Sequence, residues 1–394
     1  MTPQSYYRCW VEVDLDAIRH NVAAIRQHIG PGKKLMAVVK ADAYGHGLAQ
    51  VAGTLMRCGV DALAVANLTE ALLLRQIGGP GWPILLFGSA LPFELEKIVE
   101  QNITPTISTF DEARALDAAA ERMWERPSGR NLAASHPEGR SHKISVHVEI
   151  DTGMGRVGFW HEDAGEAIRQ ITALPHLQIE ALYTHFPSAD ENLAETRRQL
   201  TAFLKIADHR YLLHAANSAA LLNLPEAHLD LVRPGLLLYG ISPSVASGPD
   251  ATPTDFRPAL SFKARVVYVK DLAAGRSVSY GQTFVATKPM KIATIAAGYA
   301  DGFSRSLSNN AHVLIAGQRC PVVGRVTMDQ IMIDVTDLAD VNCGDEAVFI
   351  GRQGNGEISA SEVAGWEETI AWEVLCGITK TARVPRIYRG ASAA

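Results

Sequence analysis

The chain has 394 residues, of which 47% are hydrophobic and 20% are charged, so it can bury a large core and is not intrinsically disordered. The formal net charge of -5 argues against a nucleic-acid partner, which would favour a basic surface. The five cysteines are scattered and odd in number, which favours reduced thiols in a cytoplasmic protein over disulfides or a zinc site. No apolar run suits a membrane span or a signal peptide, so we expect neither.

The first predicted element is a half-buried strand over 10–15, where apolar and polar residues alternate, and an amphipathic helix over 16–29 follows it. From residue 35, short apolar strands alternate with helices of about a dozen residues, which is typical of βα units in a parallel sheet. Eight such units predict a TIM-type (β/α)8 barrel; an open doubly wound sheet is the alternative, but no G-x-G-x-x-G follows the first strand. The predicted strands are 35–40, 62–66, 84–88, 103–108, 145–150, 179–185, 211–216 and 229–233.

The pattern changes after residue 239. A connector over 241–258, rich in Pro, Ser, Gly and Thr, precedes a mostly β region with one predicted helix at 360–376. The predicted strands there are 260–269, 277–279, 291–298, 312–316, 321–326, 331–336 and 346–350. We therefore expect an N-terminal strand (1–15) paired with the C-terminal domain, a barrel (16–242) and a mostly β domain (243–394).

A segment over 126–142, rich in Gly, Ser, Pro and His, is expected to form a surface loop, with His136 and His142 solvated rather than bound to a metal.

The lysine that ends the first barrel strand, Lys40, is unusual, because lysine is rarely buried without a partner. Removing an amine from water favours its neutral form, whose lone pair reacts with a carbonyl cofactor. The alternative is a lysine that caps the strand and reaches solvent along its aliphatic stem.

Polar residues and glycines gather at the ends of the predicted barrel strands, the edge where barrel enzymes hold their active sites. Each alone fits a structural role, such as a hydrogen-bonded histidine, a turn glycine or an ion-paired arginine. Together, a lysine for an aldehyde, backbone N–H groups for a phosphate and an arginine for a ring nitrogen describe a pyridoxal phosphate site. The residues concerned are Lys40, Glu149, Asp151, Arg156, His185, His214, Ser218, Arg233 and Gly235.

At these positions the sequence resembles the alanine racemases. The matching blocks are AVVKADAYGHG at 37–47, DTGMGR at 151–156, LYTHF at 182–186, HAANS at 214–218, RPG at 233–235, SYG at 279–281, GYADG at 298–302, VGRVTMDQ at 323–330 and RVPR at 383–386. They cover nearly the whole chain in order. The resemblance implies a barrel followed by a β domain, and a head-to-tail homodimer whose active sites take residues from both subunits.

By this resemblance, Lys40 would hold pyridoxal 5'-phosphate and act as one base, and Tyr280 of the partner subunit would be the second base. Two bases on opposite faces suit the interconversion of L-alanine and D-alanine, because one removes the α-proton and the other returns a proton to the far side. Arg156 would meet the substrate carboxylate and Tyr280 of the partner subunit. The backbone at Met328, with Tyr299 nearby, would line the substrate entrance from the partner's side. Tyr44, Ser218, Gly235 and Leu236 would hold the phosphate. The remaining cofactor contacts would come from His185, Asn217 and Arg233.

Arg233 would face the pyridine nitrogen, and His185 and Arg233 would form a hydrogen-bond chain behind the ring. A guanidinium keeps its proton, so the ring would be a weaker electron sink than with an aspartate partner. This would restrain decarboxylation and transamination.

Two positions depart from the family. Many relatives carry a carbamylated lysine two residues before the DTGMGR block, where this chain has Glu149, whose carboxylate could orient Arg156 unmodified. In the alternative, Glu149 is a strand-end charge with no catalytic partner. Asp329, like Glu149, is expected behind the residues that touch the substrate. Lys380 and Ala382 stand where some relatives have a tyrosine, which leaves the pocket size open.

Three other functions fit parts of the sequence. A racemase of broader specificity, acting on serine or larger substrates, is compatible with the altered segment at 380–382. Basic amino-acid decarboxylases have a similar layout, but would need an acidic residue and a cysteine where Arg233 and Tyr280 stand. Single-domain pyridoxal phosphate carriers lack the second domain. We expect a cytoplasmic isomerase that supplies D-alanine for peptidoglycan, with no metal, nucleic-acid or membrane partner.

Overall fold

The computed structural model describes residues 6–125, 143–243, 255–378 and 383–390. The chain forms two compact units. The barrel unit comprises Ile18–Ala43 and Leu48–Arg257, and the β unit comprises Met1–Ala17, Tyr44–Gly47 and Pro258–Ala394. The loop expected over 126–142, with His136 and His142, lies outside the described residues, as does most of the connector expected over 241–258.

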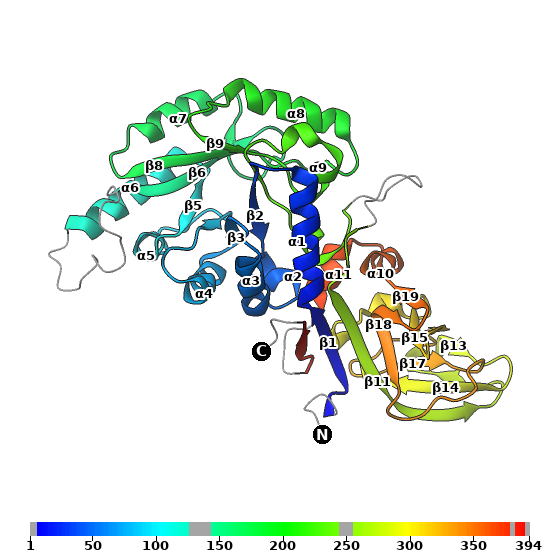
Figure 1. The fold of residues 1–394 in the computed structure, drawn as a ribbon. Helices are drawn as coiled ribbons and strands as arrows, with labels where there is room; N and C mark the ends of the chain where they lie inside the picture. The colour runs from blue at the N-terminus through cyan, green and yellow to red at the C-terminus, as the bar shows by residue number, and fades with distance from the viewer. Residues whose placement is uncertain (1–5, 126–142, 244–254, 379–382, 391–394) are drawn as a thin grey trace. The chain divides into compact units, whose positions relative to one another are not determined.

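The barrel unit is built on a parallel sheet that closes on itself (Figure 1). Its strands follow the order β2-β3-β4-β5-β6-β8-β9-β10, and β10 pairs back with β2, so the predicted TIM-type barrel is confirmed. A further strand, β7 (Phe159–Trp160), pairs with the last two residues of β6, Ile150 and Asp151. The ring strands are β2 (Lys34–Val38), β3 (Ala62–Val65), β4 (Ile84–Leu86), β5 (Thr104–Ile107), β6 (Ile144–Asp151), β8 (Leu177–Tyr183), β9 (Leu212–His214) and β10 (Leu231–Val232).

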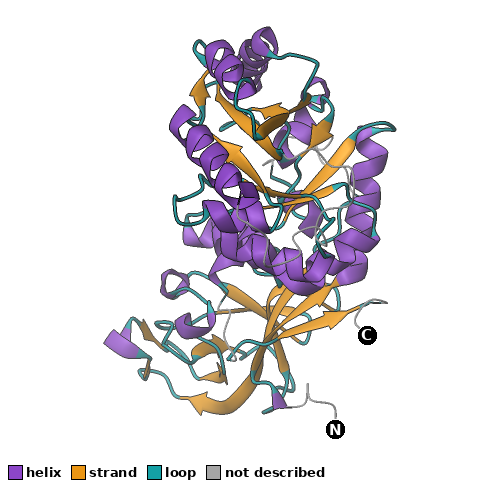
Figure 2. Ribbon diagram, turned by 90° about the vertical axis from the view of Figure 1, so that its left-hand side faces the viewer, coloured by secondary structure: helices purple, strands orange, loops and turns teal. Residues whose placement is uncertain are grey.

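Figure 2 shows the helices of this unit surrounding its strands. Each helix buries an apolar stripe; on α3, Leu48, Val51, Ala52 and Leu55 recur at helical spacing and are all buried. Side-chain caps mark the starts of α4, α8 and α9; at α4, Asn67 accepts from the backbone N–H of Glu70. The helices are α1 (Leu15–Ile29), α2 (Lys40–Tyr44), α3 (Leu48–Arg57), α4 (Leu68–Gly78), α5 (Leu95–Glu100), α6 (Phe110–Glu125), α7 (Ala164–Thr172), α8 (Leu193–Ile206), α9 (Ser218–Asn223), η3 (Pro225–Ala227) and η4 (Leu236–Tyr239).

The β unit is organised around its longest strand, β11 (Leu260–Leu272). This strand pairs with β1 and β18 along its first half and with β14 along its second, and its pairing with β14 has a register shift between Val266 and Tyr268. The N-terminal strand β1 (Cys9–Asp14) also pairs in parallel with β20 (Arg386–Arg389), so both ends of the chain enter this sheet. The mostly β character expected here is confirmed.

The remaining elements of the β unit are short. They are β12 (Ser277–Val278), η5 (Tyr280–Gln282), β13 (Phe284–Val285), β14 (Met290–Ile295), η6 (Tyr299–Asp301), η7 (Arg305–Leu307), β15 (His312–Ile315), β16 (Gln318–Pro321), β17 (Ile331–Asp334), β18 (Glu346–Gln353), β19 (Gly356–Ile358), α10 (Ala360–Glu367) and α11 (Ala371–Gly377).

Two predictions for this unit were wrong in detail. The helix expected over 360–376 is two helices, because Glu368 adopts a left-handed conformation (φ 56°) that ends α10. The strand expected over 321–326 ends at Pro321 apart from a single bridge at Val322, and Gly324 follows with φ 78°. At each place the left-handed conformation interrupts a regular apolar pattern.

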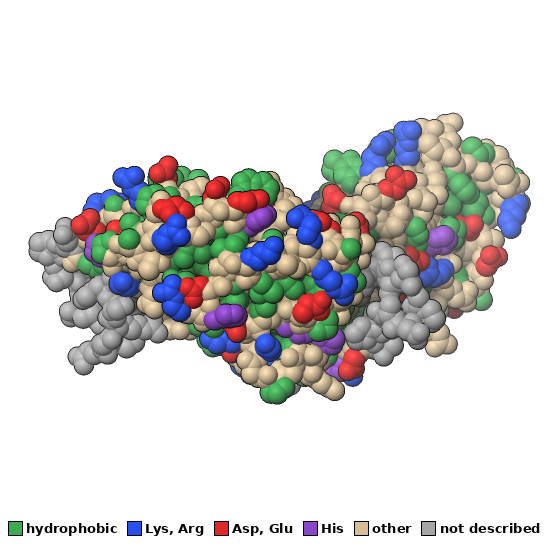
Figure 3. All heavy atoms as spheres, turned by 90° about the horizontal axis from the view of Figure 1, so that it is seen from above, with side chains coloured by type: hydrophobic (Ala, Val, Ile, Leu, Met, Phe, Trp, Pro, Cys, Tyr) green, Lys and Arg blue, Asp and Glu red, His purple; other side chains and the backbone are tan. Residues whose placement is uncertain are grey.

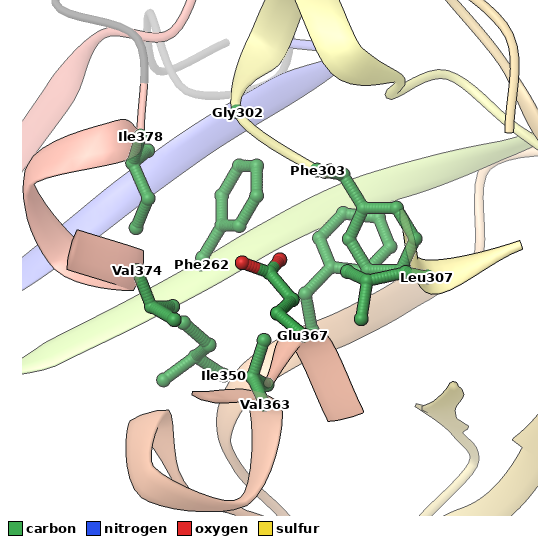
Figure 4. A pocket seen from close by; sticks show the side chains of 10 residues that line it. Phe262, Gly302, Phe303, Leu307, Ile350, Val363, Glu367, Val374 and Ile378 are labelled. Atoms are coloured by element: carbon green, nitrogen blue, oxygen red, sulfur yellow. The ribbon is translucent and has the colours of Figure 1, made fainter. Parts of the chain in front are cut away.

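Between α10, α11 and the sheet of the β unit lies a small cavity, shown in Figure 4. Its walls are apolar apart from the carboxyl group of Glu367, which points in among Phe262, Phe303 and Ile350. Burial, and then the nearby charge of Glu373, raise the pKa of Glu367.

The surface in Figure 3 carries Lys and Arg side chains interspersed with Asp and Glu side chains. No helix in the described ranges combines the length and apolarity that a membrane span requires. In the same ranges, no group of three or more His, Cys, Asp and Glu side chains could hold a metal ion.

Candidate active site

Lys40 begins the left-handed turn α2, directly after the apolar strand β2. Ala41, Asp42, Ala43 and Tyr44 have φ of 54°, 55°, 55° and 53°. Each left-handed residue other than glycine costs about 1–2 kcal/mol, so surrounding contacts must hold the turn. The backbone N–H of Asp42 donates to Glu70 (3.1 Å), and the Asp42 carboxylate accepts from the N–H of Leu48 (2.7 Å). The strained backbone of this turn therefore fixes the direction in which the half-buried side chain of Lys40 leaves the end of the strand.

Arg233 follows β10 and is buried. Its Nη1 donates to Nδ1 of His214 (2.7 Å), and its Nη2 donates to the carbonyls of Thr184 (2.8 Å) and Ala215 (3.0 Å). The expected hydrogen-bond chain therefore runs from Arg233 to His214 and not to His185. The reason is register, because His214 pairs with Leu231 on the neighbouring strand.

The proton positions in this chain follow from Arg233. A guanidinium has no acceptor atom, so Nδ1 of His214 must accept and its Nε2 carries the ring proton. That Nε2 donates to Nδ1 of His147 (3.0 Å). Burial and the charge of Arg233 lower the pKa of His147 to about 3 and hold the pKa of His214 well below its usual value. Burial lowers the pKa of Arg233 to about 10, so at neutral pH one cation faces two neutral imidazoles.

Tyr183 connects Arg233 to a buried carboxylate. Its hydroxyl donates to Oε2 of Glu149 (2.7 Å) and lies 2.9 Å from Oγ1 of Thr106. Thr106 is on β5 and Tyr183 is on β8, and β6 lies between these strands, so the contact crosses the barrel interior. The Tyr183 ring stacks on His214 (4.7 Å, 7°), and the Arg233 guanidinium lies 5.2 Å from its centre.

We call Thr106, His147, Glu149, Tyr183, His214 and Arg233 the polar layer. Thr106, His147 and Tyr183 were not among the predicted site residues. One signal was present, because His147 and Glu149 are two residues apart on a strand and so share one face. Polar residues on the inner face of an otherwise apolar strand indicate partners across the ring.

Three of the four predicted phosphate residues, Ser218, Gly235 and Leu236, lie in the loops after β9 and β10. Oγ of Ser218 accepts from the backbone N–H groups of Gly235 (2.9 Å) and Leu237 (3.4 Å). The preceding residue, Asn217, caps α9 and also donates to the carbonyl of Phe186 (3.2 Å). Leu236 begins η4 directly after Gly235. The two loops are thus joined through one buried hydroxyl group.

His185 follows β8 and is half-buried. Burial, and then the positive charges of Arg233, Arg156 and Lys40, lower the pKa of His185 to about 3. A neutral imidazole in the field of three cations marks this edge of the barrel as a place for an anionic ligand.

The loop that carries Arg156 is held by Asp151. The Asp151 carboxylate accepts from the backbone N–H groups of Gly153, Met154 and Gly155, each at 2.8 Å. Arg156 itself is exposed. Within the part of the chain that the structure describes, no hydrogen bond or ion pair joins Arg156 to Glu149.

Three predicted site residues of the β unit lie on its surface. Tyr280, Tyr299 and Met328 are all exposed. The turn of Tyr299 rests on the backbone before Met328, since its N–H donates to the Thr327 carbonyl (3.0 Å). An added Cβ at Gly298 would lie 2.1 Å from that same oxygen, so only glycine permits this approach.

Arg383 joins two carboxylates of the β unit, an arrangement that the sequence did not indicate. It donates to the buried Asp301 (3.1 Å) and to Asp329 (2.5 Å). Tyr44 also belongs to this unit and is buried, and burial raises the pKa of its hydroxyl. Lys380 lies outside the described residues, as does Ala382.

Comparison with known families decides the identity. Residues 13–243 match the model of the alanine racemase N-terminal domain, and residues 259–388 match that of the C-terminal domain. The chain belongs to the alanine racemase family.

Alanine racemases of known sequence align over nearly their full length. The alanine racemase of Desulforamulus reducens is 41% identical over 390 residues, covering 97% of this chain and 99% of that protein. The alanine racemase of Methanococcus maripaludis is 42% identical over 388 residues, covering 96% and 98%.

Solved alanine racemase structures have the same fold. That of Clostridium difficile 630 superimposes with a TM-score of 0.86 at 35% identity, covering 98% of this chain and 96% of that one. That of Bacillus anthracis with bound L-Ala-P gives 0.84 at 36% identity, with the same coverage. These matches confirm the predicted alanine racemase enzyme and its barrel-plus-β architecture.

Proposed function

We propose that this chain interconverts L-alanine and D-alanine with pyridoxal 5'-phosphate as its cofactor, using Lys40 and Tyr280 of the partner subunit as bases. The observation that carries the proposal is the set of groups after neighbouring barrel strands: the Lys40 amine after β2, the Ser218 hydroxyl after β9 and the Arg233 guanidinium after β10. An aldehyde requires an amine to react with, and a phosphate and a ring nitrogen require hydrogen-bond donors; these three groups supply them.

The donor set fits the cofactor in detail. Oγ of Ser218 already accepts two backbone N–H groups, so its own hydrogen is left to donate to a phosphate oxygen. Arg233 uses part of its five N–H donors on His214 and two carbonyls, which leaves others for a ring nitrogen. Tyr44, Gly235 and Leu236 would complete the phosphate contacts, and His185 and Asn217 would support them.

When bound, pyridoxal phosphate withdraws electrons from the α-carbon of an amino acid attached through its amine, which acidifies the α-proton. Lys40 removes that proton from one face, and Tyr280 of the partner subunit returns a proton on the other. Arg233 keeps its own proton throughout. Arg156, Tyr299 and Met328 bind the substrate, with Asp329 behind them.

The exposure of Tyr280 supports a shared site in a homodimer. A tyrosine that transfers protons in a dry site needs a covering surface, and in one copy of the chain Tyr280 is 72% exposed. A second copy that covers it would place it in the site of that copy.

The first test measures D-alanine formed from L-alanine. We expect Lys40→Ala to abolish turnover and Tyr280→Phe to reduce it at least about 100-fold. Lys34→Ala and Tyr268→Phe are matched controls, since both residues are exposed and lie outside the proposed site. Equal turnover of L-serine would indicate the broader racemase, and bound cofactor without racemisation would indicate a carrier.

The second test is complementation between subunits. Chains carrying Lys40→Ala are co-expressed with chains carrying Tyr280→Phe, and each variant alone should have almost no activity. If the two bases come from different subunits, every mixed dimer carries one intact site. Random pairing makes about half of all dimers mixed, so about one quarter of wild-type activity returns. If both bases belong to the same chain, mixing restores nothing, and the shared-site part of the proposal fails.

D-alanine made by this reaction would supply peptidoglycan, and we place the enzyme in the cytoplasm. None of the five cysteines forms a disulfide with another described residue, which agrees with a reducing compartment.

A further inference from the structure

The polar layer holds one buried cation and one buried carboxylate, Arg233 and Glu149, and both are 3% exposed. Tyr183 stands between them: it donates to Glu149 (2.7 Å), and its ring lies 5.2 Å from the Arg233 guanidinium. Thr106 keeps the tyrosine hydroxyl in place, since that hydroxyl gives its single hydrogen to Glu149 and must accept from Thr106.

A buried guanidinium needs a counter-charge, because an isolated charge in the interior is strongly destabilising. The side-chain partner of Arg233 is neutral His214, and its other acceptors are carbonyl oxygens. The groups that raise the pKa of Arg233 against the effect of burial are Tyr183 and Glu149. Glu149 therefore supplies the negative charge that Arg233 faces inside the barrel.

The position of Glu149 near the start of the Arg156 loop suggests a different partner, but the contacts do not support it. Arg156 is exposed, and the carboxylate that holds its loop is Asp151. Burial is the largest influence on the pKa of Glu149 and raises it. Among the causes that oppose burial, the Tyr183 hydrogen bond comes first and Arg233 exceeds Arg156.

We propose that Glu149 is a positioning residue for Arg233, which it reaches through Tyr183, and that it does not orient Arg156. The Glu149–Tyr183 pair holds the Arg233 guanidinium in its position inside the barrel and keeps it positively charged. His214 and His147 fix its orientation. The consequence for cofactor binding rests on the proposed function; the pairing of Glu149 with Arg233 does not.

The test is a pair of double-mutant cycles in the full-length protein, read by the dissociation constant of pyridoxal 5'-phosphate and by the KM for L-alanine. One cycle combines Glu149→Gln with Tyr183→Phe, and the other combines Glu149→Gln with Arg156→Gln. The matched controls are Glu180→Gln, an exposed carboxylate on β8, and Tyr211→Phe, a tyrosine near the start of β9 that the polar layer does not include.

We expect Glu149→Gln and Tyr183→Phe each to weaken cofactor binding about tenfold, and the double variant to be no worse than either single one, because both remove the same connection. Arg156→Gln should raise the KM for L-alanine without changing the dissociation constant of pyridoxal 5'-phosphate. In the variant that combines Arg156→Gln with Glu149→Gln, each of the two quantities should change by the sum of the two single effects, expressed as free energies. The two controls should change neither quantity.

The proposal is overturned if Glu149→Gln raises the KM for L-alanine, leaves the cofactor constant unchanged and is non-additive with Arg156→Gln. It is also overturned if Glu149→Gln and Tyr183→Phe act additively. Should Glu149→Gln fail to fold, Tyr183→Phe tests the proposal by itself, because it keeps the aromatic ring and the Glu149 carboxylate and removes only the hydroxyl between them. An unchanged dissociation constant for pyridoxal 5'-phosphate in Tyr183→Phe would then overturn the proposal.

If the wild-type protein binds no pyridoxal phosphate, the proposed function fails. The first cycle, repeated on urea unfolding, then tests the Glu149–Tyr183 connection by itself. Adding Arg233→Lys to each variant tests whether that connection acts on Arg233.

Discussion

The polar layer of the barrel unit and three site residues of the β unit differ in exposure. In the barrel unit, Glu149, His214 and Arg233 are at most 3% exposed, with Glu149 bonded to Tyr183 and Arg233 bonded to His214, whereas in the β unit Tyr280, Met328 and Tyr299 are 72%, 51% and 44% exposed. The barrel therefore organises its part of the site within a single chain. The β unit offers residues that lack a covering surface, which is what a site completed by a second subunit requires.

The comparison predicts unequal costs for removing an arginine from each unit. Arg233→Met leaves buried acceptors and a buried carboxylate without their cation, and should lower the free energy of unfolding by about 3–5 kcal/mol. Arg383→Met in the β unit removes an exposed arginine from the buried Asp301 and the exposed Asp329. It should cost less, about 1–3 kcal/mol, because the Asp301 carboxylate still accepts from the backbone N–H of Gly298. Urea denaturation followed by circular dichroism measures both. Equal losses would contradict the contrast between a buried layer and an exposed surface.

The exposed residues of the β unit should nevertheless stand on a rigid backbone. Gly298→Ala would push a Cβ against the carbonyls of Thr327 and Met328 and should lower the free energy of unfolding by about 1–3 kcal/mol. In Gly365→Ala, the added Cβ meets nothing within 4 Å on helix α10, so this variant should gain about 0.5–1 kcal/mol. If both alanines are tolerated alike in thermal unfolding, the support for Tyr299 is not rigid.

Acid should weaken the barrel unit through its neutral histidines. The pKa of His147 is about 3 in the folded chain and near 6.5 when unfolded, so between these values the unfolded chain binds more protons. Stability therefore falls as pH falls below about 6.5, by up to about 1.4 kcal/mol per pH unit for this group.

His147→Gln keeps an acceptor for His214 and should reduce this pH slope, whereas His209→Gln, at an exposed position, should not. Urea unfolding at about pH 7 and about pH 5 compares them. An unchanged slope for His147→Gln would mean that His147 is protonated in the folded protein.

The smallest expected effect concerns Glu367 in the cavity of the β unit. Its pKa is raised in the folded chain, so its ionised form destabilises the fold above the usual carboxyl range and this penalty disappears as pH falls. Glu367→Gln should raise the free energy of unfolding at pH 7 by less than about 1 kcal/mol, and the exposed control Glu368→Gln should not. A loss of stability in Glu367→Gln would show that the carboxylate is satisfied there.

Local patterns along the chain were enough to predict the barrel, the mostly β region that follows it and the strand ends where Lys40, Ser218 and Arg233 lie. Apolar runs, helix periodicity and turn residues are properties of short segments, and the carboxyl ends of parallel strands share one edge by construction. The motif blocks added the family, which the comparisons confirmed.

The pairing of side chains inside the barrel was decided only by the tertiary structure. Tyr183 meets Glu149 across 34 residues of chain and Thr106 across 77, and Arg233 meets His214 rather than His185. A strand pattern tells which face a residue occupies, but which residues meet inside a closed ring depends on strand order, register and stagger. For the same reason, the sequence predicted a charge at Glu149 but not that Tyr183 stands between this charge and Arg233.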